Sequence, residues 1–292
     1  MSDLPLPEPV RTDQALDIQH DTDPADEHGN AHRIPHLGHA LLFFSLMGFC
    51  ILVVQVLVLF AVHGFTPPAA MQHPYALAAG LMIGYALTFA IAIPAFRAIW
   101  GLPFLRGISW TWRAARLRWW KLLLLGCALS VIAQLLERFI KSPVTSDISQ
   151  LLRNPLAAWL TVILGTLIAP VVEEVAFRGF LLPALATAYD WLALDRTPAG
   201  LHRWLRGADH TLGALIFGTL LSSFAFAALH GTQLHWAIGP LVILFVMSLA
   251  FSAVRIRTRS VAASTLVHVA YDALIFVEVA IATAGFHHLD KL

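Results

Sequence analysis

The hydrophobic pattern of the chain is a series of long apolar runs separated by shorter polar segments. A helix that crosses a bilayer needs about 20 predominantly apolar residues. The runs that reach this length cover residues 39–64, 74–99, 120–138, 156–188, 211–230, 236–254 and 261–284. The pattern therefore predicts an all-α fold, a polytopic membrane helix bundle of about seven transmembrane helices.

The fourth run is unusually long, and it contains Pro170. A proline inside a helix removes one backbone hydrogen bond and kinks or breaks the helix. We therefore expect this run to be kinked or divided at Pro170, and a division would add an eighth, short helix.

The composition is that of a membrane protein. Hydrophobic residues make up 58% of the 292 residues, charged residues make up 13%, and the mean hydropathy is +0.71. Soluble domains carry about 25% charged residues, so that class is excluded. Cys50 and Cys127 both lie in apolar runs, and they indicate neither a disulfide framework nor a metal site.

Residues 1–38 have a different character, with eight acidic residues against two arginines and scattered prolines. Such a composition is typical of a disordered acidic tail. The basic start and compact apolar run of a signal peptide are missing. We expect the tail to be cytoplasmic, for the reason that follows.

Basic residues are concentrated in three loops, at 97–121, 190–210 and 255–259. All three lie on one side of the membrane if the N-terminus is cytoplasmic, as the positive-inside rule requires. We therefore expect a multi-pass protein of the cell membrane with its C-terminus outside. Within 101–119, apolar residues recur every three or four positions, which predicts an interfacial basic helix between the N-terminal transmembrane helices of 39–138.

The fourth run also carries charge, in the stretch Pro170-Val-Val-Glu-Glu-Val-Ala-Phe-Arg-Gly179. Charged side chains at membrane depth are expensive and indicate a function by default. Glu174 and Arg178 are four residues apart on a helix and can form an ion pair. Glu173 points about 100° away and has no such partner. A buried pair alone would indicate helix packing, but the additional free carboxylate favours a functional site.

Polar residues in two later apolar runs are suited to act together with the carboxylate of Glu173. His230 follows Phe226 by four residues on one run, and Asp272 follows His268 by four on another. If these helices pack together, Glu173, His230 and His268 converge. Such a set can activate water and stabilise an oxyanion. Two imidazoles and a carboxylate also suit zinc.

Three motifs in this order carry a family resemblance: Glu173-Glu174-Val-Ala-Phe-Arg178, Phe226-Ala-Ala-Leu-His230 and His268-Val-Ala-Tyr-Asp272. The chain resembles the CPBP family, which includes CAAX prenyl endopeptidases and bacteriocin-immunity (Abi-type) relatives. The resemblance covers about residues 156–275, within a predicted catalytic bundle of 156–284. It implies an intramembrane endopeptidase that acts on a protein or peptide substrate in the lipid bilayer, with no nucleic acid as partner.

By this resemblance, Glu173 and His230 activate the attacking water, His268 and Asp272 hold the oxyanion, and Glu174 and Arg178 support the site. The family's last motif most often ends in Asn, whereas this chain has Asp272. An ionised Asp accepts hydrogen bonds and cannot donate one to an oxyanion. In addition, straight helices would place His230 near the outer surface, away from Glu173 and His268.

The family has been described both as metalloproteases and as metal-independent glutamate proteases. The chain has no H-E-x-x-H pair, so we predict a reaction without a cofactor. Zinc held by Glu173, His230 and His268 is the alternative. Two other classes would use the same residues differently, namely a proton- or ion-coupled transporter and a non-catalytic membrane scaffold. The chain lacks the paired halves typical of transporters.

Overall fold

The computed structural model describes residues 34–62, 74–140, 155–206 and 209–285, and every regular element in these ranges is a helix. Among these residues, seven helices are long and apolar enough to cross a membrane. Six are single elements: α1 (Leu37–Ala61), α3 (Pro74–Trp100), α6 (Trp119–Glu137), α12 (Leu212–Leu229), α13 (Ile238–Thr258) and α14 (Val261–Ala282). The predicted all-α bundle of about seven spans is confirmed. Residues 1–33 of the predicted tail lie outside the described residues.

The remaining span, Leu156–Leu192, is one continuous helical segment, which we call the long helix. It consists of α8 (Pro155–Ile163), the π-helix η1 (Leu164–Ile168), α9 (Ala169–Glu174), the π-helix η2 (Val175–Leu181) and α10 (Leu182–Leu192). Pro170 and Pro183 each follow one of the π-helical stretches. A proline cannot donate the usual backbone hydrogen bond, and a local π register accommodates that loss. The long helix is therefore modified at Pro170 and not divided there.

The helices fall into two units, which we describe separately. The smaller unit contains α11 (Pro198–Arg206), whose start is capped by Thr197. The Gly200 N–H donates to the Thr197 hydroxyl at 3.1 Å, and that hydroxyl donates to Asp195. The larger unit contains all seven spans.

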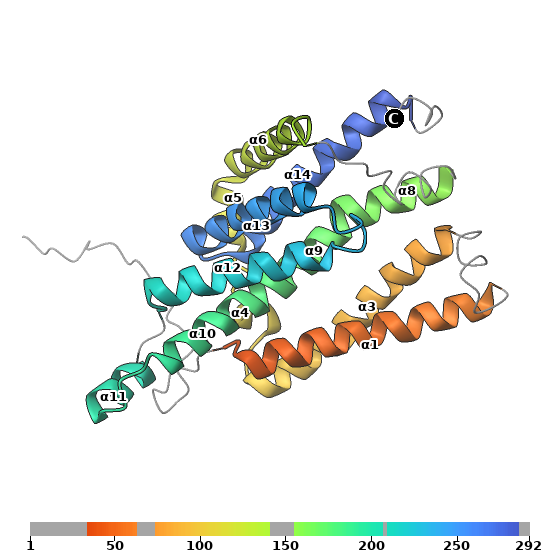
Figure 1. The fold of residues 1–292 in the computed structure, drawn as a ribbon. Helices are drawn as coiled ribbons and strands as arrows, with labels where there is room; N and C mark the ends of the chain where they lie inside the picture. Colours follow the sequence, from red (N-terminus) through yellow and green to blue (C-terminus); the bar gives the residue numbers. More distant parts are fainter. Residues whose placement is uncertain (1–33, 63–73, 141–154, 207–208, 286–292) are drawn as a thin grey trace, which may run out of the picture. The chain divides into compact units, whose positions relative to one another are not determined.

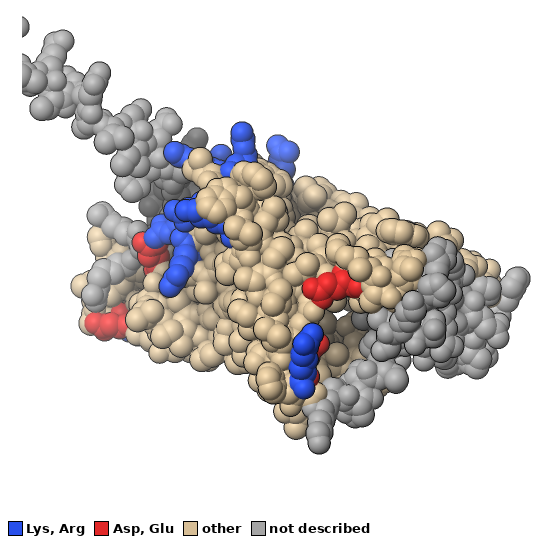
Figure 2. Space-filling view, turned by 90° about the horizontal axis from the view of Figure 1, so that it is seen from above, with Lys and Arg blue, Asp and Glu red and all other residues tan. Residues whose placement is uncertain are grey.

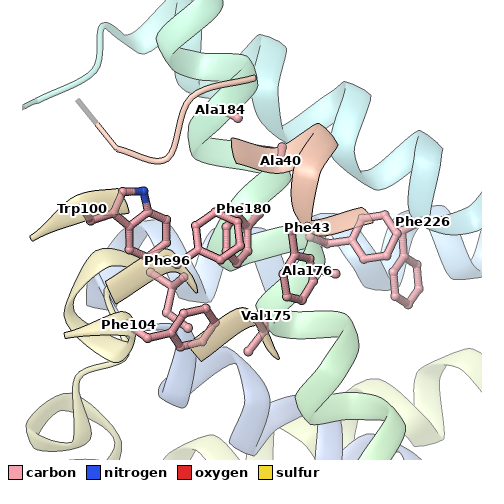
Figure 3. Close-up of a cluster of buried hydrophobic side chains, with 13 residues drawn as sticks. Ala40, Phe43, Phe96, Trp100, Phe104, Val175, Ala176, Phe180, Ala184 and Phe226 are labelled. Carbon is pink, nitrogen blue, oxygen red and sulfur yellow. The ribbon is translucent and has the colours of Figure 1, made fainter. Parts of the chain in front are cut away.

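Within the larger unit the long helix is central (Figure 1). Helices α1 and α3 lie side by side and pack on one flank of it, while α14 packs on another flank together with α6 and α13. Five aromatic rings join α1, α3 and the residue Phe104 that follows α3 to η2 (Figure 3). Phe43 and Phe180 stack with ring centroids 4.3 Å apart, and Phe96 lies 4.9 Å from Phe180. Trp100 and Phe104 complete the cluster. This apolar core holds the segment directly after Glu173 and Glu174 in place.

The chain between α3 and α6 differs from the expected single helix over 101–119. It forms two short helices, α4 (Phe104–Gly107) and α5 (Trp112–Leu117). Between them Ser109 has a positive φ of 56°, and its carbonyl accepts a hydrogen bond from Val261 N–H at 3.1 Å. The backbone leaves the helical conformation here because it is bonded to the start of α14.

Helix α12 packs along α10. Thr211, the residue before α12, donates its hydroxyl to Asp190 near the end of α10 at 2.6 Å. From that point α12 reaches only to the middle of the long helix before it ends at Leu229. Straight helices of equal length would place His230 near the outer surface, away from Glu173. In the structure His230 lies beside Glu173, at the middle of the long helix, because the long helix extends beyond its neighbours.

Candidate functional site

Glu173 and Glu174 are the last two residues of α9, directly before η2. They have opposite environments. Glu174 is completely buried, whereas 22% of the Glu173 side chain is exposed. Neighbouring residues on a helix point about 100° apart, so one carboxylate faces the packed interior and the other faces an open space.

Arg178 is completely buried, and all three nitrogens of its guanidinium form hydrogen bonds. Nη1 donates to Glu174 Oε1 at 2.8 Å, and Nη2 donates to the Ser248 carbonyl at 2.8 Å and to the Ser248 hydroxyl at 2.7 Å. Nε donates to the Ser252 hydroxyl at 3.4 Å. The guanidinium also lies over the Phe226 ring, 5.0 Å from its centroid. Buried charge of this kind is tolerated because each of the three guanidinium nitrogens has a hydrogen-bond partner.

Sequence reasoning did not identify Ser248 and Ser252 as members of this cluster. They are four residues apart on α13, and thus on one face of an otherwise apolar helix. That spacing is a signal which the sequence contains. Through them, Arg178 links the long helix to α13.

His268 lies on α14 between two carboxylates and is 4% exposed. Nδ1 is 3.0 Å from Glu174 Oε1, and Nε2 is 3.3 Å from Asp272 Oδ2. The ring stacks on Phe251 with centroids 4.5 Å apart. Nε2 also faces Glu173 Oε2 at 3.8 Å. The position of the imidazole is therefore fixed from both sides.

His230 directly follows the last turn of α12. Its Nδ1 is 2.9 Å from the Phe226 carbonyl oxygen. Since a carbonyl only accepts hydrogen bonds, Nδ1 is the donor, and in the neutral ring Nε2 is then an acceptor. Nε2 faces Glu173 Oε1 at 3.8 Å. The Phe226 ring packs beside the imidazole, 4.8 Å from it.

The structure thus brings Glu173, His230, His268 and Asp272 together, with Glu174 and Arg178 behind them. Both imidazoles stop 3.8 Å from Glu173, which is beyond hydrogen-bond distance. Within the described part of the chain, Glu173 therefore accepts no hydrogen bond. A partly open carboxylate and the free nitrogen of His230 are two acceptors that can share one water molecule.

A metal site would be the alternative use of the same residues. Among the described residues, no three His, Cys, Asp or Glu side chains are arranged to hold a metal ion. In this arrangement both nitrogens of His268 already face carboxylates, and zinc would need one of them free.

The fold and this cluster define a class: a polytopic helical membrane protein with a Glu–His cluster inside its spans. Residues 155–274 match the family model described as type II CAAX prenyl endopeptidase Rce1-like. This part of the chain is therefore similar to that family, and the resemblance to CPBP proteases is confirmed. The match covers less than half of the chain, from α8 into α14. Comparison with curated proteins and with solved structures gives no match.

Proposed function

We propose that the protein is an intramembrane endopeptidase in which Glu173 and His230 activate the attacking water. One observation carries this proposal. Glu173 is a partly exposed carboxylate within a membrane span, it accepts no hydrogen bond from a described residue, and an imidazole lies 3.8 Å from each of its oxygens. A carboxylate in this position is suited to act as a general base.

In the proposed reaction, water donates one hydrogen bond to Glu173 and the other to His230 Nε2. Glu173 takes a proton while the water oxygen forms a bond to the peptide carbonyl carbon, and the carbonyl oxygen becomes an oxyanion. His268 Nε2 faces this space and donates to the oxyanion. The C–N bond then breaks, and the proton on Glu173 passes to the leaving amine.

Three further residues support His268 and Glu173 in this proposal. Glu174 accepts a hydrogen bond from His268 Nδ1, Asp272 lies 3.3 Å from Nε2, and the two carboxylates orient the ring. Arg178 compensates the charge of buried Glu174. We propose a reaction without a metal cofactor, and no step requires one.

The basic loops support a membrane orientation with the N-terminus in the cytoplasm. Ser260 donates to the Thr111 carbonyl at 2.7 Å, so the turn at 255–259 lies against the basic segment 111–121. Figure 2 shows Lys and Arg side chains gathered over one part of the visible face. Under the positive-inside rule this side is cytoplasmic. Single cysteines at positions 113 and 285 should react with an impermeant thiol reagent from opposite sides of sealed vesicles.

The substrate is proposed to be a protein or peptide at the membrane. A peptide that ends in a prenylated CAAX sequence is the first probe, because the description of the matched family names this class. Comparison of the peptides in membranes with wild-type protein and with Glu173→Gln tests the proposal. A substrate should accumulate uncleaved in Glu173→Gln and not in the control Glu137→Gln, whose carboxylate is exposed at the end of α6. Identical peptide populations would argue against a protease.

A further inference from the structure

The long helix and its neighbours α1 and α12 form an apolar groove. Helices α1 and α12 each pack against η2 and α10, on either side of the long helix (Figure 1). Between them lies a hollow of about 890 Å³ whose lining residues are all apolar. They come from the first two turns of α1, from η2 and from the second half of α12. Leu41 and Phe224 line it and are 71% and 63% exposed, so the groove opens toward the lipid.

The floor of the groove is the face of the long helix that carries Glu173. Phe177 and Leu181 line the groove and follow Glu173 by four and eight residues, so the three share one face. The Phe177 ring packs against Phe226, 5.1 Å away, and Phe226 packs beside the imidazole of His230. On α12 the last lining residue directly precedes His230. The groove therefore leads along the long helix to the carboxylate and the imidazole of the site.

The site itself lies at apolar depth. His268 is seven residues beyond Val261, the first residue of α14, so it lies about 10 Å along that helix. The turn before α14 carries three arginines, and we expect it at the membrane surface. The hydrocarbon core of a bilayer is about 30 Å thick, so this depth is well inside it. A peptide bond that reaches Glu173 from the side therefore belongs to a segment that is itself in the membrane.

The shape of the groove suits a helix. Small residues line both of its walls, Gly38 and Ala40 on α1 and Ala225 and Ala228 on α12. In membranes, small residues let helices approach closely, and van der Waals packing then holds the helices together. Helices α1 and α12 both pack on the long helix but have little contact with each other. A further helix can therefore pack between them, against the same face of the long helix.

We propose that the groove binds an apolar membrane-spanning helix of the substrate and guides one end of it to Glu173. This inference rests on the proposed function, and it narrows the substrate to a protein with a segment in the membrane. The apolar lining offers no hydrogen bonds, which suits a helix because its backbone groups are bonded internally. The last carbonyl groups of a helix have no intrahelical partner, so a helix that ends at Glu173 presents an accessible carbonyl to the attacking water.

Photocross-linking in proteoliposomes tests this inference. Benzoylphenylalanine replaces Phe224 in the full-length Glu173→Gln protein, so that binding is measured without cleavage. The probe is a fluorescent single-span peptide of about 20 leucine and alanine residues. Position 224 should cross-link this peptide. Benzoylphenylalanine at Leu124, which is equally exposed but lies on α6, is the matched control and should not.

Filling the groove is the second test. Ala225→Leu combined with Ala228→Leu adds side-chain volume to one wall and should lower the cross-linking yield about 10-fold, because overpacked contacts are costly. Ala128→Leu is the matched control, since Ala128 is exposed on α6, and it should leave the yield unchanged. If the doubly substituted protein does not fold, the cross-links at positions 224 and 124 decide alone.

The outcomes separate this inference from the proposed function. Cleavage that survives Glu173→Gln overturns the proposed function, whereas the cross-links report on the groove without any cleavage. A single-span peptide that does not cross-link at position 224, or that cross-links equally well in the filled groove, overturns the inference alone. A cross-link formed only with a farnesylated CAAX peptide, with residues 1–33 of the same chain or with a second copy also overturns it, because the groove would then hold another occupant.

Discussion

At the scale of single residues, the site shows how two adjacent glutamates acquire different chemistry. Glu174 is paired with Arg178 at 2.8 Å and is completely buried, so it is part of the structure. Glu173 is open to the space between His230 and His268. The difference follows from the 100° rotation between neighbours on a helix, and it makes Glu173 the residue available for reaction.

The buried pair gives the first prediction. Arg178→Ala should lower the free energy of unfolding by about 3–5 kcal/mol, because it leaves buried Glu174 charged and removes the bonds to α13. Glu174→Gln should cost less, since its amide oxygen still accepts from Arg178. Thermal melting in detergent measures both variants, with exposed Arg138→Ala as control. Equal melting temperatures for the two buried variants would contradict the account of the pair.

Asp272 gives the second prediction. It is one helical turn beyond His268 and lies 3.3 Å from its Nε2. Asp272→Asn should keep substantial activity, because the amide oxygen can still accept this hydrogen bond. Asp272→Leu should lose most activity, because it leaves the ring without its second anchor. If Asn is as inactive as Leu in a cleavage assay, the negative charge of Asp272 is required and its role here is wrong.

At the scale of elements, the site depends on how closely helices approach the long helix and α14. Gly126 of α6 faces the turn of α14 that carries His268. A Cβ atom at this position would overlap the Val267 carbonyl and the Ala270 side chain. Helix α6 therefore approaches α14 only because residue 126 has no side chain.

The third prediction follows from this contact. Gly126→Ala should destabilise the protein by about 1–3 kcal/mol and lower kcat, because α14 must move away with His268. Gly48→Ala is the matched control: this glycine of α1 has open space around it, and a helical alanine there should be neutral or stabilising. Melting and cleavage assays on both variants check it. Normal melting and normal activity in Gly126→Ala would show that the helices tolerate the added methyl group.

Most of the helices were predictable from the sequence. The apolar runs predicted the seven spans, since long apolar helices need only local pattern to be recognised. The spacing of Glu174 and Arg178 predicted their ion pair in the same way. The depth of His230 was not predictable, because it depends on where α12 starts along the long helix. Ser248 and Ser252 were also missed, because their bonds to Arg178 join two spans far apart in sequence.

At the scale of the whole molecule, the matched domain does not account for the site alone. Helices α1 and α3 precede residues 155–274, yet their aromatic rings hold η2 in place. We therefore propose that the N-terminal helices help to position the long helix and are not a separate anchor.

The metal content of the whole protein is the fourth prediction. We expect no stoichiometric zinc, because both nitrogens of His268 face carboxylates and a glutamate base needs no metal. Elemental analysis of the purified protein, before and after treatment with a chelator, measures this. About one zinc per chain, lost together with activity, would instead favour a metalloprotease.

Cleavage by the purified protein in proteoliposomes tests the central claim most directly. We predict that Glu173→Gln and His230→Ala each lower kcat about 100-fold or more, since a general base and its partner act as a unit. The controls Glu137→Gln and His202→Ala change exposed residues of the same types and should cleave normally. Near-normal turnover by Glu173→Gln, in protein that melts like wild type, would contradict the account.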